Sequence, residues 1–207
     1  MSDIQAIQKH LTTVQSRRKA AIWWISICFA PVIFFTTAHF QVGSWQRDWI
    51  EDIGAMLIFV AILGRAWCTL YIGGRKTLVL VKTGPYSISR NPLYFFSFVA
   101  VAGLGLQTGS IIMAALMTLV AYLIFLPIVL REEAGLLSVH GQNYHAYRCS
   151  VPRFLPRPAL WQDIDSVAAD PRVLRRTIMD GMAFVLLAFL IRALLRLLPD
   201  LPQVTLY

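Results

Sequence analysis

Forty consecutive residues in the middle of the chain, Asn91–Leu130, carry no charged side chain. A helix needs about 20 mostly apolar residues to cross the hydrocarbon core of a bilayer, and irregular backbone there would leave its polar groups unpaired. The run is therefore long enough for two membrane spans. Its one polar cluster, residues 107–110, predicts a turn, so we expect a helical hairpin formed by Pro92–Leu106 and Ser110–Leu130.

The composition of the whole chain agrees with a membrane domain. Of 207 residues, 57% are hydrophobic and 14% are charged, with a mean hydropathy of +0.60, whereas about 25% charged residues are usual in soluble domains. This balance excludes an intrinsically disordered chain. Three further apolar stretches of spanning length are Ala20–Ala38, Ile53–Ile72 and Ile178–Leu198. We therefore predict an all-α fold, a polytopic membrane helix bundle of about five transmembrane helices.

Two of these stretches contain charged residues. Arg65 lies within the second, and Asp180, Arg192 and Arg196 lie within the last. The last stretch could therefore either span the bilayer or lie in its interface as an amphipathic helix. Arg65 lies seven residues before the end of its span, roughly 10 Å below the surface at 1.5 Å per residue. Its side chain could either contact a substrate headgroup or extend to the surface.

The net charge is +8, from 19 Lys and Arg against 11 Asp and Glu. In a soluble chain this excess would suggest a nucleic-acid partner. In an apolar chain it is typical of loops that face anionic membrane lipids, so we expect no nucleic acid. The number of Lys and Arg residues differs between the polar segments: there are four in 1–19, one in 40–52, four in 73–91, none in the hairpin turn and seven in 131–177. The positive-inside rule then predicts a cytoplasmic N-terminus and two cytoplasmic polar segments, and the small size favours a bacterial inner membrane.

The first cytoplasmic segment contains turn residues followed by a helix start. Gly84 and Pro85 are typical of a turn, and Pro92 suits the first turn of a helix and restricts Asn91 before it. A helix N-terminus at the membrane surface offers free N–H groups to an anion. Alternatively, the segment is a plain surface turn in which Arg90 reaches lipid headgroups.

Two adjacent carboxylates, Glu132 and Glu133, stand where the fourth predicted span reaches the cytoplasmic face. They are unexpected against the negative potential of that surface, and ionisable groups at membrane depth indicate function. On a helix they lie about 100° apart, so one could hold a ligand while the other pairs with a nearby Arg. The alternative is a charged helix end that simply leaves the bilayer.

A helical face follows the two carboxylates. Leu136, His140, Tyr144 and Tyr147 recur at spacings of four, four and three residues, which predicts that they share one side of a helix. An amphipathic helix lying on the membrane would show the same pattern.

The three cysteines, Cys28, Cys68 and Cys149, are scattered along the chain. They include no CxxC pair, which argues against a disulfide framework and against a zinc site. We therefore expect no metal.

Taken in order, these segments resemble the signature of the isoprenylcysteine carboxyl methyltransferase and phospholipid methyltransferase superfamily. That signature consists of GPY, a short spacer, R-H/N-P-x-Y, an apolar hairpin, EE, and a G-x-x-Y-x-x-Y helix that ends in VP. The resemblance covers about residues 53–157. The matching residues are Gly84-Pro85-Tyr86, Arg90-Asn91-Pro92-Leu93-Tyr94, Glu132-Glu133, Gly141, Tyr144, Tyr147 and Val151-Pro152.

The resemblance implies an integral-membrane enzyme that transfers a methyl group from S-adenosylmethionine, without a Rossmann domain, to a lipid-like acceptor that enters from the bilayer. It also implies a cofactor pocket at the cytoplasmic face, enclosed by the two polar segments. The catalytic residues expected by resemblance are Arg90, Asn91 and Glu133. The residues expected to bind the cofactor are Gly84, Pro85, Tyr86, Arg90, Asn91, Pro92, Tyr94, Glu132, Glu133, Tyr144, Tyr147 and Arg148.

The residue types at these positions suit this cofactor. Its ammonium and ribose diol suit a Glu, its carboxylate suits an Arg, and its sulfonium cation suits the ring of a Tyr. Asn91 stands where the carboxyl methyltransferase branch usually has His, and it is closer to the phospholipid branch. Because an Asn side chain does not titrate, this position excludes a His-dependent proton step.

The resemblance divides the chain into an N-terminal segment with the first span (1–52), a methyltransferase core (53–157), and a linker with a C-terminal hydrophobic helix (158–207). Two other functions stay open. One is a membrane reductase of lipid double bonds that uses NADPH, whose 2′-phosphate Arg75 and Lys76 would bind. The other is a non-catalytic membrane scaffold. The residues also leave open which acceptor is methylated and what the oligomeric state is.

Overall fold

The structure is a computed structural model that describes residues 36–37, 43–72, 79–167, 169–197 and 204–205. Helices dominate these ranges, which agrees with the predicted all-α membrane bundle. In chain order the elements are β1 (Thr36–Thr37), α2 (Trp45–Ile72), α3 (Pro85–Ile88), α4 (Pro92–Leu106), α5 (Ile111–Ser150), the 3₁₀ helix η1 (Pro158–Leu160), α6 (Pro171–Leu197) and β2 (Val204–Thr205).

One short parallel strand pair is the exception to the all-helical prediction. Thr36 of β1 pairs with Val204 of β2, and Thr37 pairs with Thr205. The first predicted span, 20–38, is therefore wrong in including Thr36–Thr37 in a helix. β-branched threonines favour strands, and the pairing depends on a distant segment that no local pattern shows. The remainder of that span lies outside the described residues, as does the Arg75-Lys76 pair.

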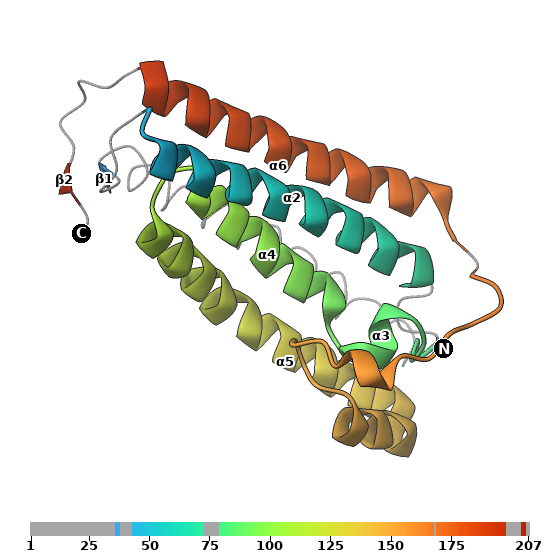
Figure 1. The fold of residues 1–207 in the computed structure, drawn as a ribbon. Helices are drawn as coiled ribbons and strands as arrows, with labels where there is room; N and C mark the ends of the chain where they lie inside the picture. The colour runs from blue at the N-terminus through green and yellow to red at the C-terminus, as the bar shows by residue number, and fades with distance from the viewer. Residues whose placement is uncertain (1–35, 38–42, 73–78, 168, 198–203, 206–207) are drawn as a thin grey trace, which may run out of the picture.

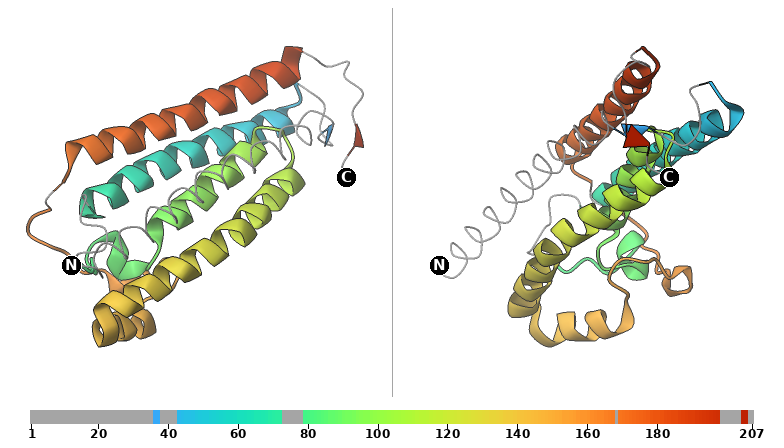
Figure 2. Two further views of the ribbon diagram at one scale, coloured as in Figure 1. Left: turned by 180° about the vertical axis from the view of Figure 1, so that it is seen from behind. Right: turned by 90° about the vertical axis from the view of Figure 1, so that its left-hand side faces the viewer.

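The long helices run antiparallel and lie side by side in the order α6, α2, α4, α5 (Figure 1). Figure 2 shows the same arrangement from behind. In the described part of the chain, α2, α5 and α6 are long and apolar enough to cross a membrane, and α4 is a shorter apolar helix of 15 residues. Because α2 and α5 end where α4 and α6 begin, the two polar segments meet at one end of the bundle.

The predicted hairpin is confirmed, since α4 has the expected bounds and α5 begins one residue later than expected. Ser110 is the N-cap of α5, and its Oγ accepts a hydrogen bond from Met113 N over 3.2 Å. Close packing of α4 depends on a glycine. A Cβ on Gly103 would lie 2.7 Å from the carbonyl oxygen of Gly54, so α2 and α4 approach backbone to backbone.

Three helices are longer than predicted, and one of them, α6, begins at Pro171 rather than Ile178. α2 begins at Trp45 rather than Ile53, because the charged residues of its first turns are paired within the helix and with α6. α5 continues beyond Leu130 to Ser150, since a helix satisfies its own backbone both in lipid and in water. Its geometry breaks only at Gly141, with φ 50° and ψ −125°. The face predicted to be continuous across this position is therefore divided by a kink.

The helix α6 packs along α2, and ion pairs hold its last turns. Arg192 Nε lies 2.8 Å from Glu51 Oε2, and Arg196 Nη2 lies 2.7 Å from Asp48 Oδ1. Glu51 is only 1% exposed and is also paired with Arg47. These contacts explain how a helix with two arginines near one end remains part of an apolar bundle.

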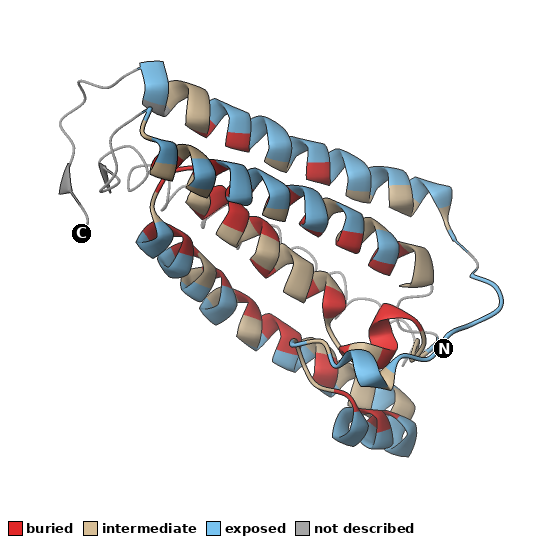
Figure 3. Ribbon diagram, viewed as in Figure 1, coloured by how far each residue is buried: buried red, intermediate tan, exposed pale blue. Residues whose placement is uncertain are grey.

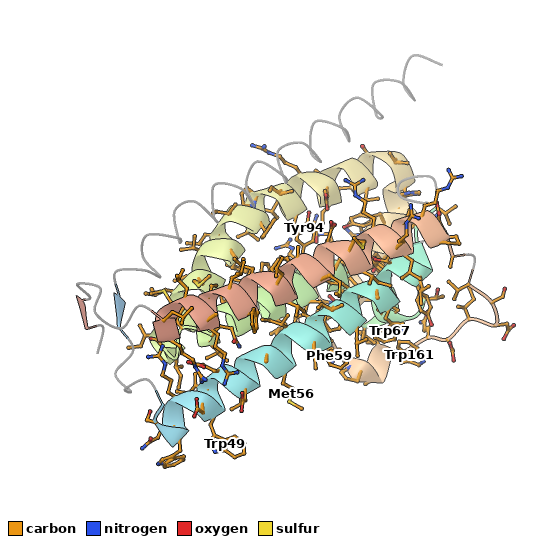
Figure 4. All side chains as sticks on the ribbon, turned by 90° about the horizontal axis from the view of Figure 1, so that it is seen from above. Trp49, Met56, Phe59, Trp67, Tyr94 and Trp161 are labelled. Carbon is orange, nitrogen blue, oxygen red and sulfur yellow. The ribbon has the colours of Figure 1, made fainter. Side chains whose placement is uncertain are left out.

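Burial follows the bundle geometry. Side chains between the helices are buried, and the outward faces are exposed and apolar, as expected of surfaces that contact lipid (Figure 3). Figure 4 shows Trp49, Met56 and Phe59 along the outer face of α2. One core cluster consists of Ile58, Leu104, Met113, Met117, Ala188 and Ile191.

Candidate active site

The two polar segments are joined through their backbones. Arg90 N donates to Pro152 O over 2.8 Å, and Asn91 N donates to Arg153 O over 3.1 Å. Residues 152 and 153 directly follow α5, so these hydrogen bonds tie the start of α4 to the residues that leave α5. The structure therefore confirms that the two segments fold over each other.

The single turn of α3 is fixed from three directions. Tyr147 Oη donates to the carbonyl oxygen of Tyr86 over 2.6 Å, and Gly84 N donates to Gln162 O over 2.8 Å. Gly84 has a φ of 59°, and the ring of Tyr71 on α2 packs directly against it, leaving no room for a Cβ. A glycine is required there both by the backbone conformation and by the close approach.

Side chains from three parts of the chain converge on the carboxylate of Glu133. Arg90 Nη1 donates to Oε2 over 3.1 Å, and Asn91 Nδ2 donates to Oε1 over 3.0 Å. Arg153 donates through Nε to Oε1 and through Nη2 to Oε2, each over 3.1 Å. Glu133 is 5% exposed. The two carboxylate oxygens are therefore occupied by protein donors.

This arrangement determines what Glu133 does in the described structure. A buried carboxylate is tolerated when charged and polar partners surround it, and two guanidiniums and one amide do so here. The hydrogen bonds to Glu133 raise the pKa of Arg153. The carboxylate at position 133 thus pairs with two arginines, as expected for one member of the adjacent pair. Glu132, the neighbour, is half-buried.

The buried atoms that have no hydrogen-bond partner among the described residues include the hydroxyl of Tyr86 and Nε of Arg90. Burial is the main cause that raises the pKa of Tyr86, and the negative charge of Glu132 raises this pKa further. The phenol therefore stays protonated near neutral pH and acts as a donor. Unsatisfied buried donors of this kind suit a ligand with acceptor atoms.

The structure places the other expected site residues at the same end. Tyr144 is buried beside Tyr147, and its pKa is raised to about 12, first by burial and then by the charge of Glu133. Pro85, Pro92 and Tyr94 are also buried in the first turns of α3 and α4. Tyr94 packs against Phe125 of α5 with ring centroids 5.5 Å apart.

One expected residue lies outside the buried cluster. The side chain of Arg148 is exposed, one residue after the buried Tyr147. Because Tyr144 and Tyr147 both face the interior, a helix of this pitch points position 148 about 100° away from Tyr147. The arginine that completes the cluster is instead Arg153.

Arg153 and Trp161 were missed by sequence reasoning. Arg153 directly follows Val151-Pro152, and that position was the only signal for it. Trp161 stacks on Trp67 of α2 with ring centroids 5.5 Å apart (Figure 4), which anchors the second polar segment to the bundle. No spacing in the sequence links these two tryptophans, since they come from segments almost a hundred residues apart.

Comparison with known proteins identifies the family that this chain matches. The phospholipid methyltransferase family matches residues 51–143, which include most of α2, all of α4 and both Glu132 and Glu133. The protein-S-isoprenylcysteine O-methyltransferase of Schizosaccharomyces pombe is 33% identical over 81 residues, or 39% of this chain and 34% of that protein. The chain belongs to the isoprenylcysteine carboxyl methyltransferase and phospholipid methyltransferase superfamily. It is a membrane methyltransferase.

Two relatives match the methyltransferase over most of its length. The nickel-cobalt-cadmium resistance protein NccN of Alcaligenes xylosoxydans xylosoxydans is 34% identical over 187 residues, which are 88% of this chain and 85% of the relative. The cobalt-zinc-cadmium resistance protein CzcN of Cupriavidus metallidurans is 28% identical over 187 residues, 90% of this chain and 86% of the relative. No solved structure matches the chain significantly.

Proposed function

We propose that this membrane methyltransferase takes its methyl group from S-adenosylmethionine and transfers it to a lipid-like acceptor that reaches the site from the bilayer. The observation that carries the proposal is the network on Glu133. It joins Arg90 and Asn91 of the first polar segment to Arg153 of the second around one buried carboxylate. These are the segments that family resemblance associates with the cofactor.

The side chains beside this network fit the donor molecule. Arg90 has a buried Nε without a partner among the described residues, which suits the carboxylate of S-adenosylmethionine. Glu132 is half-buried and suits the ammonium group or the ribose diol. The ring of Tyr144 suits the sulfonium cation.

When bound, S-adenosylmethionine supplies a methyl group that is already activated by its positive sulfur. The task of the protein is then to orient the two reactants and to exclude water. Glu133 holds Arg90 and Asn91 in fixed positions, and the buried rings of Tyr94 and Tyr144 keep water from the site. Asn91 does not titrate, so it serves in positioning and takes no proton.

We place the reaction at the cytoplasmic face of a bacterial inner membrane, with a cytoplasmic N-terminus. The support is the charge distribution, because Lys and Arg concentrate in the two segments that meet at the Glu133 end. The opposite end holds the hairpin turn, which has no charged residue. A cofactor made in the cytoplasm would reach the first end directly.

A binding titration tests the proposal. Full-length protein in phosphatidylcholine nanodiscs is titrated calorimetrically with S-adenosylhomocysteine and, separately, with NADPH. We expect saturable binding of S-adenosylhomocysteine only. Binding of NADPH alone would support the reductase instead, and binding of neither would support the scaffold. Mass spectrometry of membrane lipids after incubation with methyl-labelled donor then identifies the acceptor.

A further inference from the structure

One charged side chain of α6 has no partner within the described part of the chain. The apolar stretch 178–198 contains three charged residues, of which Arg192 and Arg196 pair with acidic side chains of α2. Asp180 is exposed and forms neither a hydrogen bond nor an ion pair among the described residues. An ionisable side chain within a membrane helix is costly unless it is paired. Asp180 therefore indicates an interaction that a single chain does not supply.

Contacts with α2 fix the depth of Asp180. Thr177 Oγ1 lies 3.2 Å from Thr69 Oγ1, and a Cβ on Gly181 would lie 2.9 Å from the side chain of Ile62. Asp180 lies between these two levels, roughly 10 Å from the end of α2 at 1.5 Å per residue. Amine groups of membrane lipids lie at the surface, so a cation on a neighbouring helix is the better partner for this carboxylate.

The exposed face of α6 has the spacing of a helix–helix interface. Four exposed apolar residues recur at intervals of four, three and four positions: Met179, Ala183, Leu186 and Leu190. This is the heptad pattern with which two helices pack along each other. Gly181 and Ala188 are buried on the side that packs against α2, and each lies two positions, or about 200°, after a residue of this stripe. The stripe therefore faces away from the rest of the bundle.

The position of α6 leaves this stripe open. The helix lies at one edge of the layer of long helices, next to α2 (Figure 1), and its visible surface is mostly exposed (Figure 3). No other described helix covers the stripe, so a second helix can lie along it without displacing α2. A second copy of α6, placed there by a two-fold axis along the membrane normal, would run parallel to the first.

The charges beside the stripe are complementary to a second copy of themselves. In a parallel pair of heptad helices, a residue on one flank of the stripe lies beside the partner residue five positions later, and such residues form salt bridges. Asp180 is on one flank, directly after Met179, and Arg175 is five positions earlier on the other flank. Arg175 is exposed and, like Asp180, has no partner among the described residues. The cation that Asp180 lacks within one chain is thus supplied by the second.

We propose that α6 is the interface of a parallel homodimer in the membrane, in which Arg175 of each protomer pairs with Asp180 of the partner subunit. Two-fold symmetry forms this ion pair twice. Arg176 precedes the apolar part of the stripe, where water and salt screen the repulsion between its two copies. The interface is separated by α2 and α4 from α5, which carries Glu133. Each Glu133 network therefore forms within one chain, and the inference does not depend on the proposed function.

Reversal of the two charges tests the ion pair. Sedimentation equilibrium of the full-length protein in a density-matched detergent measures the dimer dissociation constant. Asp180→Arg and Arg175→Asp should each weaken dimerisation at least tenfold, because like charges then meet. The double variant Arg175→Asp/Asp180→Arg should restore the constant to within threefold. Arg157→Asp, at an exposed position outside α6, is the control and should leave the constant unchanged.

Three results of this experiment would overturn the inference. The first is an unmodified protein that stays monomeric at every concentration, which would leave Asp180 to a lipid or to a different protein. The second is a single reversal that dimerises as tightly as the unmodified protein. The third is a double reversal that dimerises no better than the single ones, which would show that the two side chains do not meet.

Cross-linking tests the same interface without a change of charge. In a chain whose three native cysteines are replaced by Ala, Leu186→Cys places a thiol on the stripe and Phe59→Cys places one on the outer face of α2. The two native side chains are 59% and 61% exposed. They lie at similar depth, since the nearby residues Ala188 and Ile58 belong to one core cluster.

Mild oxidation of native membranes should link Leu186→Cys into disulfide dimers at least ten times faster than Phe59→Cys. Equal rates would indicate random collision, and faster linkage of Phe59→Cys would place the interface on α2. Either of these results overturns the inference, even where the charge-reversed variants fail to fold.

Discussion

Asn91 Nδ2 donates a hydrogen bond of 3.0 Å to Glu133 Oε1, although the two residues are 42 positions apart in the chain. The apolar hairpin of α4 and α5 separates them in sequence and returns them to the same end of the bundle. One contact thus joins the start of α4 to the polar continuation of α5. Arg90 and Arg153 share the same carboxylate. Both the stability of this end of the bundle and the positions of the site residues therefore depend on Glu133.

Replacing Glu133 by Gln should affect folding and binding at once. The change removes the charge that pairs with Arg90 and Arg153, and breaking a buried pair costs about 3 kcal/mol. We expect a lower free energy of unfolding in an SDS titration and at least a tenfold loss of S-adenosylhomocysteine affinity by calorimetry. Glu132→Gln is the matched variant, and it should lose affinity with little loss of stability. Equal stability of Glu133→Gln and the unmodified protein would contradict the structural role given to Glu133.

Removal of the Tyr147 hydroxyl should loosen α3. In Tyr147→Phe the carbonyl oxygen of Tyr86 loses its 2.6 Å hydrogen bond while it stays buried. Leaving such an acceptor unsatisfied costs about 1–3 kcal/mol. Hydrogen–deuterium exchange of residues 85–91 should become faster, whereas Tyr122→Phe, at an exposed tyrosine, should not change it. Unchanged exchange in Tyr147→Phe would show that α3 is held by other contacts.

At the opposite end of the bundle, Glu51 should determine how firmly α6 is attached. Glu51 is paired with Arg47, Arg192 and Arg196, so Glu51→Gln should destabilise the protein by about 3 kcal/mol. Asp52→Asn, which removes an exposed partner of Arg192, should cost less than about 1 kcal/mol. SDS unfolding titrations compare the two. Equal losses of stability in the two variants would mean that the burial of Glu51 does not strengthen its ion pairs.

Labelling of cysteines tests which side of the membrane the site faces. Cys149 is exposed near the end of α5, and we expect it to react with a membrane-impermeant maleimide only after the cells are opened. A Trp45→Cys variant, at the exposed start of α2, should react in intact cells. Peptide mass spectrometry identifies the labelled residue, and Cys149→Ser is the blank. Reaction of Cys149 in intact cells would reverse the proposed orientation.

Local patterns predicted much of the architecture. The uncharged run defined the hairpin to within one residue, because the length of an apolar helix is set by the bilayer and its ends by Pro92 and Ser110. The same patterns placed the end of α5 at Leu130. Hydropathy indicates where a helix leaves the lipid, but it does not indicate where the helix itself ends. The helix continues to Ser150, and the two glutamates lie within it.

The sequence by itself determined that this chain is a helical membrane protein of the methyltransferase superfamily, because apolar length and the ordered motifs are properties of the linear chain. Only the tertiary structure decided which charges meet. It paired Glu133 with Arg90 and Arg153, and it paired Glu51 with Arg192 of a distant helix. The physical reason is that ion pairs form over a few ångströms between segments far apart in the chain, and helix packing alone sets those distances.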